Sequence, residues 1–261
     1  MTHIALSVLL GALIGLSLGL VGGGGSILTV PILVYAIGQP VQAATTTSLA
    51  IVGLNALVGM AGHARAHRVD FRTGLLFGVV GIGGALIGSW LNTFVPASVL
   101  LVLFALIMLV AAAAMLRRRS EPSETGRVQG GVRSAREWAT IAASGTVVGL
   151  MTGFFGVGGG FVIVPALVLV LVLGLSMRLA VGTSLLIIAI NSAVSLAAHL
   201  RTGSLDLAVT GLFVLGGLVG ALVGVSLAGR VPQRRLTQVF AALIFIGAGY
   251  ILYRAAVGTK T

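Results

Sequence analysis

Long apolar runs of near-membrane length dominate this sequence and leave few residues that could cover a water-facing surface. They span roughly 4–38, 41–62, 73–92, 97–116, 139–174, 178–198, 207–228 and 233–253. A helix needs about 20 mainly apolar residues to cross a bilayer. Only 8% of this chain is charged, against about 25% of a soluble domain. We predict an all-α, multi-pass membrane protein whose solvent is the lipid bilayer.

Arginines lie in clusters between the apolar runs rather than along one exposed face. The clusters are Arg65, Arg68 and Arg72; Arg117, Arg118, Arg119, Arg127, Arg133 and Arg136; and Arg230, Arg234 and Arg235. Clusters at segment ends are typical of cytoplasmic loops, so the net charge of +11 does not indicate a nucleic-acid partner. Residues 117–137, rich in Arg, Ser, Gly and Glu, predict a solvated linker.

Side chains for covalent, redox or metal chemistry are scarce. The chain has no cysteine and five carboxylates, and none of the carboxylates lies inside an apolar run. The sequence also lacks a metalloprotease motif and a phosphate-binding loop. We therefore predict no enzyme activity, no cofactor and no metal site. A cation carrier would need acidic groups at membrane depth, so cation transport is disfavoured.

The two halves of the sequence correspond residue by residue. With an offset of 134, Gly15, Gly19, Gly22, Gly24, Gly25, Val30 and Pro31 correspond to Gly149, Gly153, Gly156, Gly158, Gly159, Val164 and Pro165. With an offset of 136, Thr47, Ser48, Asn55, His63, Arg65 and Asp70 correspond to Thr183, Ser184, Asn191, His199, Arg201 and Asp206. Apolar composition alone would not align these polar residues. We predict two homologous transmembrane repeats of about four apolar segments each, 1–116 and 138–261.

Glycines interrupt the first apolar run of each repeat, at 22–25 and at 156–160. The flanking pieces, about 17 and 13 residues, would be about 26 and 20 Å long as helices, against a hydrocarbon core of about 30 Å. We therefore expect neither piece to span the membrane comfortably. Glycine-interrupted segments at matching places in two repeats are typical of the broken helices that line a transporter's central site.

The charges indicate how the repeats are oriented. In the first repeat 63–72 is basic and 93–96 is uncharged, whereas in the second the three arginines lie at 229–235 and Arg201 is balanced by Asp206. If each glycine-broken run enters the membrane and returns, the repeats are inverted and the basic loops share one side. We favour this arrangement. One crossing per run, with parallel repeats, is the alternative.

The glycine runs and the polar residues that follow them predict an anion-binding site. A helix start presents free N–H groups and a positive dipole end, and glycine lets a ligand approach the backbone. Tight helix packing is the alternative role for the glycines, helix capping for the hydroxyls, and interhelical hydrogen bonding for the amides. The candidate substrate-binding residues are Gly22, Gly23, Gly24, Gly25, Ser26, Thr47, Ser48, Asn55, Gly156, Gly158, Gly159, Gly160, Thr183, Ser184 and Asn191.

A histidine and an arginine mark the end of the second apolar run in each repeat. These pairs are His63 with Arg65 and His199 with Arg201. Anchoring at the membrane surface is the simpler interpretation. The alternative is a gate or proton relay, because histidine titrates near neutral pH, and a coupling proton would then be a partner of the protein.

Taken together, these motifs resemble those of the sulfite exporter TauE/SafE family of membrane permeases. The residues that carry the resemblance are Gly22, Gly23, Gly24, Gly25 and Ser26 with Val30, Pro31, Thr47 and Ser48, and Gly158, Gly159 and Gly160 with Val164, Pro165 and the run from Ala180 to Ser184. The resemblance covers nearly the whole chain outside 117–137. It implies a permease for sulfite, an organosulfonate or a related organic anion at a bacterial inner membrane.

We weigh three functions for such a chain. An alternating-access carrier that binds a small anion at its glycine-rich helix breaks is the favoured one. A passive anion channel would share the same loops but would show no substrate saturation. A non-transporting membrane scaffold would depend on exposed loops, and this chain has few of them.

Overall fold

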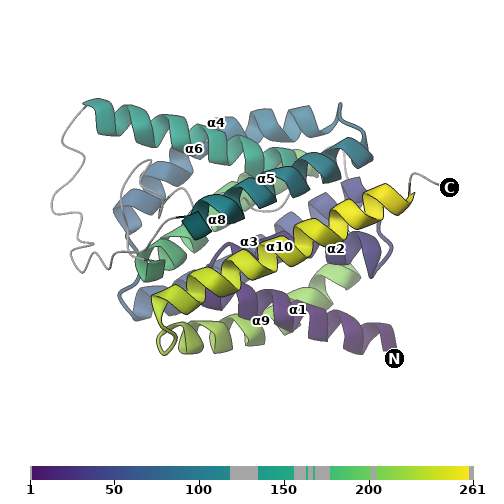
Figure 1. Cartoon of the computed structure of the whole chain (residues 1–261), viewed down its shortest axis with the longest axis horizontal. Helices are drawn as coiled ribbons and strands as arrows, with labels where there is room; N and C mark the ends of the chain where they lie inside the picture. Colours follow the sequence, from purple (N-terminus) through teal and green to yellow (C-terminus); the bar gives the residue numbers. More distant parts are fainter. Residues whose placement is uncertain are drawn as a thin grey trace.

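The computed structural model describes residues 2–117, 135–155, 163, 167, 177–200 and 204–258, and these residues are helical apart from short connections. The helices are α1 (Thr2–Val21), α2 (Gly24–Tyr35), α3 (Val41–Arg65), α4 (Phe71–Asn92), α5 (Ala97–Arg117), α6 (Ala135–Phe155), α8 (Met177–His199), α9 (Leu207–Ala228) and α10 (Gln233–Gly258). Figure 1 shows that α1 begins and α10 ends at the same end of the bundle. The predicted all-α fold is confirmed for the described residues.

Five of the described helices are long and apolar enough to cross a membrane. The candidate spans are Ile4–Val21, Val41–Arg65, Phe71–Asn92, Arg178–His199 and Leu207–Ala228. The expectation that neither flanking piece of the first run would span is wrong for α1. That helix has 20 residues, and the apolar part from Ile4 to Val21 alone has 18, enough for a candidate span. The 12 residues of α2 reach only about 18 Å.

The chain turns back on itself between α1 and α3. Gly22 ends α1 with a φ of +73°, a left-handed conformation that favours glycine. A methyl group on Gly25, at the start of α2, would overlap the carbonyl oxygen of Ile14, so α2 packs closely on α1. The glycine contacts show that α1 and α3 both run parallel to α9, which means that α2 is the returning segment.

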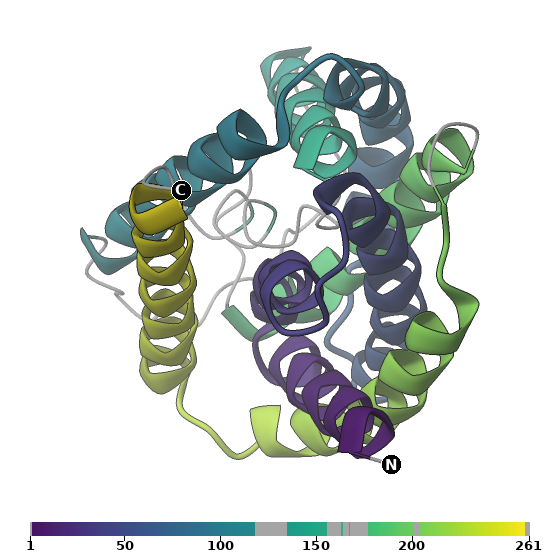
Figure 2. The ribbon, with the colours of Figure 1, turned by 90° about the vertical axis from the view of Figure 1, so that its right-hand side faces the viewer.

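Helices far apart in the sequence pack closely through glycines. A methyl group on Gly15 of α1 would overlap the carbonyl oxygen of Gly217 on α9, and one on Gly149 of α6 would overlap that of Gly81 on α4. Small residues of this kind let helix backbones approach within a membrane. Each half of the chain is therefore packed mainly on the other half. Figure 2 shows α5 and α10 side by side on another flank.

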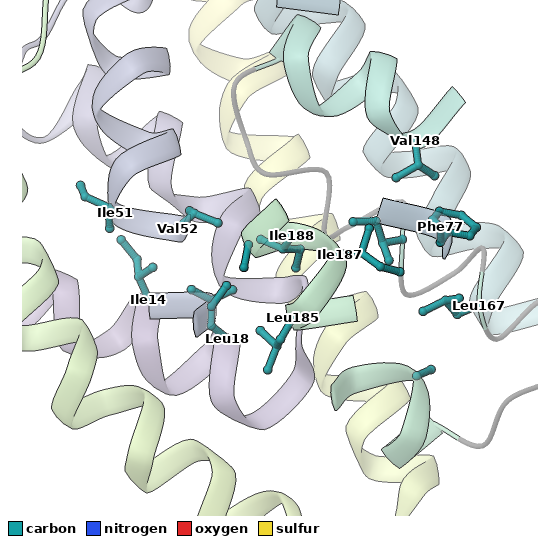
Figure 3. Close-up of a cluster of buried hydrophobic side chains, with 14 of the residues drawn as sticks. Ile14, Leu18, Ile51, Val52, Phe77, Val148, Leu167, Leu185, Ile187 and Ile188 are labelled. Atoms are coloured by element: carbon teal, nitrogen blue, oxygen red, sulfur yellow. The ribbon is translucent and has the colours of Figure 1, made fainter. Parts of the chain in front are cut away.

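The two central helices, α3 and α8, are antiparallel. Gly53 packs on Ser192, and Gly59 packs on Leu185, so the residue numbers increase along one helix as they decrease along the other. Buried side chains from α1, α3, α4, α6 and α8 surround this crossing (Figure 3). They include Ile14, Leu18, Ile51, Val52, Phe77, Val148, Leu185, Ile187 and Ile188.

Two basic connections meet at one end of the bundle. The guanidinium Nη2 of Arg68, before α4, lies 2.7 Å from the position of a methyl group on Gly229, after α9. Beside them, Arg178 Nη2 at the start of α8 donates to the carbonyl oxygen of Val231 at 3.5 Å. The nearby Asp70 caps α4 by accepting from the Thr73 N–H at 3.1 Å. The charge at this end is therefore mainly positive.

Candidate functional site

The first glycine run forms a turn that leaves the start of α2 without a side-chain cap. The N–H of Gly22 donates to the Leu18 carbonyl at 2.8 Å and completes α1. Gly23 then occupies the cap position of α2 and has no side chain to cap it. Ser26 Oγ donates to the Gly23 carbonyl at 2.6 Å, which holds the turn closed. The N–H groups of the first helical turn have no intrahelical acceptor.

The Gly22 turn, defined as Gly22 to Ser26, lies against the second half of the chain. A methyl group on Gly22 would lie 2.7 Å from Ser184 Oγ and 3.2 Å from Val181 Cα, both on α8. Ser184 Oγ itself donates to the Val181 carbonyl at 2.8 Å. The structure thus brings together the first glycine run and one predicted hydroxyl from the other half. For Gly25, packing on α1 accounts for the glycine.

The other predicted pair of hydroxyl side chains, Thr47 and Ser48, lies far from this turn. His63 Nε2 lies 2.8 Å from the Gly19 carbonyl oxygen, so the Gly22 turn lies near the C-terminal end of α3. Thr47 precedes His63 by about 24 Å along α3. Thr47 and Ser48 therefore do not share a site with the Gly22 turn. Thr47 Oγ1 is buried and has no hydrogen-bond partner within the described residues.

Thr183 has a structural partner. Its Oγ1 accepts a hydrogen bond from the backbone N–H of Asp70 at 3.0 Å, which joins α8 to the connection before α4. The second glycine run, with Gly156, Gly158, Gly159 and Gly160, lies outside the described residues, as does Arg201. That the two glycine runs surround one anion therefore stays a prediction.

Both predicted asparagines are buried near the middle of their helices. The Asn55 amide of α3 occupies the space that a methyl group on Gly217 of α9 would fill. The Asn191 amide of α8 lies near Gly81 of α4 but less closely, with Oδ1 2.9 Å from the position of such a methyl group. Each side chain is 0% exposed, and both atoms of each amide lack a hydrogen-bond partner within the described residues.

A third asparagine, Asn92, makes an interhelical hydrogen bond and serves as a comparison for Asn55 and Asn191. Its Nδ2 donates to the carbonyl oxygen of Phe154 on α6 at 2.7 Å. Neither Asn55 nor Asn191 makes such a bond to a described residue. An unsatisfied amide is costly at this depth, and a polar ligand would satisfy it.

The two predicted histidines are buried at opposite ends of the molecule. His63 is 1% exposed and contacts Gly19 of α1, whereas His199 is 5% exposed and its Nδ1 lies 2.9 Å from the carbonyl oxygen of Ser195 on its own helix. The second ring nitrogen of each lacks a partner among the described residues. Arg65 is exposed. The rings therefore do not face water as surface anchors would.

Sequence reasoning missed two polar residues on α8. Ser192 and Ser195 are fully buried, and neither hydroxyl has a partner in the described part of the chain. A search for residues shared by both halves passes over them, because Ala56 and Gly59 stand at the matching positions of α3. Their helical spacing from His199 was the available signal.

Known proteins similar to this chain are described as probable membrane transporters. A family model described as Sulfite exporter TauE/SafE matches residues 7–251. A probable membrane transporter protein of Xylella fastidiosa (strain 9a5c) is 33% identical over 253 residues, which cover 94% of this chain and 93% of the relative. The probable membrane transporter protein YdhB of Bacillus subtilis (strain 168) is 28% identical over 228 residues, covering 87% and 91%. No solved structure matches the chain.

Proposed function

The chain belongs to the sulfite exporter TauE/SafE family of multi-pass membrane transporters, which are not enzymes, and we propose that it carries a small anion by alternating access. The substrate is sulfite, an organosulfonate or a related organic anion, since the family's description names sulfite. The anion passes between two inverted repeats, 1–116 and 138–261. None of the five carboxylates lies inside an apolar run, and this fits an anionic substrate better than a cationic one.

The course of the helices supports the inverted arrangement. The sequence correspondence pairs α3 with α8, and these helices run antiparallel, with Gly53 on Ser192 and Gly59 on Leu185. The correspondence also relates two contacts, Gly15 with Gly217 and Gly149 with Gly81. Inverted repeats of this kind let one half rock against the other around a site between them.

The observation that carries the proposal is the pair of buried amides, Asn55 and Asn191. Both lie near mid-helix, at the depth where transporters of this type bind their substrates. Their Nδ2 groups are donors that lack an acceptor in the described residues. An oxyanion supplies strong acceptors for such donors. The amides therefore act as ligands rather than as interhelical bonds.

The Gly22 turn contributes a second contact, closer to the basic end. The uncapped start of α2 attracts an anion through its N–H groups and dipole, and Ser26 and Ser184 lie beside it. Arg68 and Arg178 lie at the same end of the bundle. Their positive potential raises the local concentration of anions.

Counterflow in proteoliposomes tests the proposed activity. Vesicles that contain the purified chain and unlabelled sulfite are diluted into labelled sulfite, with taurine, sulfoacetate and sulfate as competitors. A carrier gives saturable, transient accumulation of label, and competition identifies the substrate class. Flux without saturation or counterflow would instead identify a passive channel, and no flux from folded protein would contradict the proposal.

The variants Asn55→Ala and Asn191→Ala test the role of the amides. If the amides bind the anion, each change lowers counterflow at least tenfold and leaves the thermal stability in detergent unchanged or higher, because an unsatisfied buried group is removed. Asn92→Ala is the matched control, since it loses a hydrogen bond and should lower stability by about 1 kcal/mol. Unchanged counterflow in both amide variants would refute their role.

The variants Gly22→Ala and Gly38→Ala separate backbone strain from contact at the turn. Both glycines have positive φ, +73° and +82°, so both variants carry a strain of about 1–2 kcal/mol. A methyl group on Gly22 would contact Ser184 Oγ, whereas nothing lies within 4 Å of a methyl group on Gly38. We expect transport to fall only in the Gly22→Ala variant, and equal losses would show that strain alone is responsible.

A further inference from the structure

One face of α8 carries a row of buried polar side chains. Ser192, Ser195 and His199 recur at helical spacing and lie on the same face of α8. All three are at most 5% exposed. Oγ of each serine and Nε2 of His199 have no hydrogen-bond partner among the residues that the structure describes. Asn191, whose amide is also unsatisfied, begins the row.

Unsatisfied groups in such number do not fit a packing role. A buried donor or acceptor without a partner is destabilising, and native proteins normally satisfy such groups with protein atoms or ordered water. The row extends from Asn191 to His199, about 12 Å along the helix. A continuous polar strip of this length indicates a path for water and a polar solute.

The matching face of α3 does not have this strip. In the sequence correspondence, the positions that match the two serines of α8 are Ala56 and Gly59. The matching histidine, His63, already has its Nε2 bonded to the Gly19 carbonyl. The strip is therefore a property of one half of the chain and not of the duplicated unit.

The strip begins at the boundary between the two halves. A methyl group on Gly53 of α3 would lie 3.1 Å from Cβ of Ser192, so α3 covers the start of the strip. Because α3 and α8 belong to different halves, a rocking motion that separates them would uncover Ser192 and the residues that follow it. The conformation described here has the strip closed.

We infer that Ser192, Ser195 and His199 line the route by which a hydrated small anion passes between Asn191 and the end of the molecule at which α8 ends. The serine hydroxyls donate hydrogen bonds to the anion and replace part of its water shell. The inference rests on the proposed anion transport. It adds the residues that line the anion's path between Asn191 and the end of α8.

Single cysteines test the route, because the native chain contains none. Ser192→Cys and Ser195→Cys place one thiol each in the strip, and Ala193→Cys places one on the exposed, opposite face of α8. Full-length protein in proteoliposomes is treated with a membrane-impermeant thiol reagent. We expect both strip variants to react at least ten times faster than Ala193→Cys, sulfite to change that rate, and the reaction to block counterflow.

The labelling and the transport are measured separately, so the two possible failures are distinguishable. Equal, slow labelling of all three variants, in protein that still performs counterflow, would overturn the route and leave the proposed function intact. Labelling that leaves counterflow unchanged would also overturn it. Absence of counterflow by the unsubstituted chain would instead be a failure of the proposed function.

Discussion

The two central helices, α3 and α8, carry the same amide and imidazole but connect them differently to the rest of the molecule. On α3, His63 is bonded to Gly19 of α1. On α8, His199 is bonded to the carbonyl of Ser195, within its own helix. The imidazole of α3 therefore joins two helices, whereas the hydrogen bond of the α8 imidazole lies within its own helix.

The threonines at the start of the two helices show the reverse difference, because here α8 has the contact to another segment. Thr183 of α8 accepts a hydrogen bond from Asp70 N–H, whereas Thr47 of α3 has no partner in the described residues. A polar contact thus holds α3 near its C-terminal end, and another holds α8 near its N-terminal start. Because the helices are antiparallel, both fixed ends lie toward the basic end of the bundle.

The glycines that face the two amides should give the largest effect. In Gly217→Leu and Gly81→Leu the new side chain would overlap the Asn55 or Asn191 amide, and such overpacking should cost about 3 kcal/mol or more. We expect little folded protein by size-exclusion chromatography. Gly211→Leu and Gly83→Leu are the controls on the same helices, since nothing lies within 4 Å of a methyl group there. Normal yields for all four variants would contradict the packing described.

The threonine pair should show an intermediate effect that differs between the helices. Thr183→Val leaves the Asp70 N–H without its acceptor and should lower stability by about 1–3 kcal/mol. Thr47→Val removes a buried hydroxyl without a described partner and should leave stability unchanged or raise it slightly. Thermal unfolding in detergent measures both. Equal losses would mean that the two threonines have the same structural role.

The histidine pair should show the smallest difference. His63→Leu removes a hydrogen bond between α3 and α1 and should cost about 1 kcal/mol more stability than His199→Leu, which removes a bond within one helix. The same unfolding assay compares the two variants at a pH where both histidines are neutral. A larger loss for His199→Leu would show that α8 is the more firmly held helix.

The helices themselves were predictable from the sequence, because apolar runs and polar interruptions fix where membrane helices begin and end. The run at 73–92 corresponds to α4, which begins at Phe71, directly after its capping residue Asp70. The length of α1 was underestimated, since the polar Thr2 and His3 lie before the apolar run and are nevertheless helical. Composition cannot show that a polar residue extends a helix.

The sequence predicted which polar residues are candidates for the site, but it did not predict which of them lie together. The internal correspondence identified Asn55 and Asn191, and the structure buries both. It did not show that Ser184 meets the Gly22 turn while Thr47 lies far away, because periodicity does not tell which helix faces which. It also missed Ser192 and Ser195, because a comparison of two halves reveals only what they share.

The sidedness of two corresponding connections tests the inverted arrangement most directly. Ala66 follows α3 and Ser204 follows α8, and both are exposed. Ala66→Cys and Ser204→Cys each introduce the only thiol of the chain, and an impermeant thiol reagent is added to one side of oriented membranes. We predict that the two variants are labelled from opposite sides. Labelling of both from the same side would contradict the antiparallel course of α3 and α8 and the transport mechanism built on it.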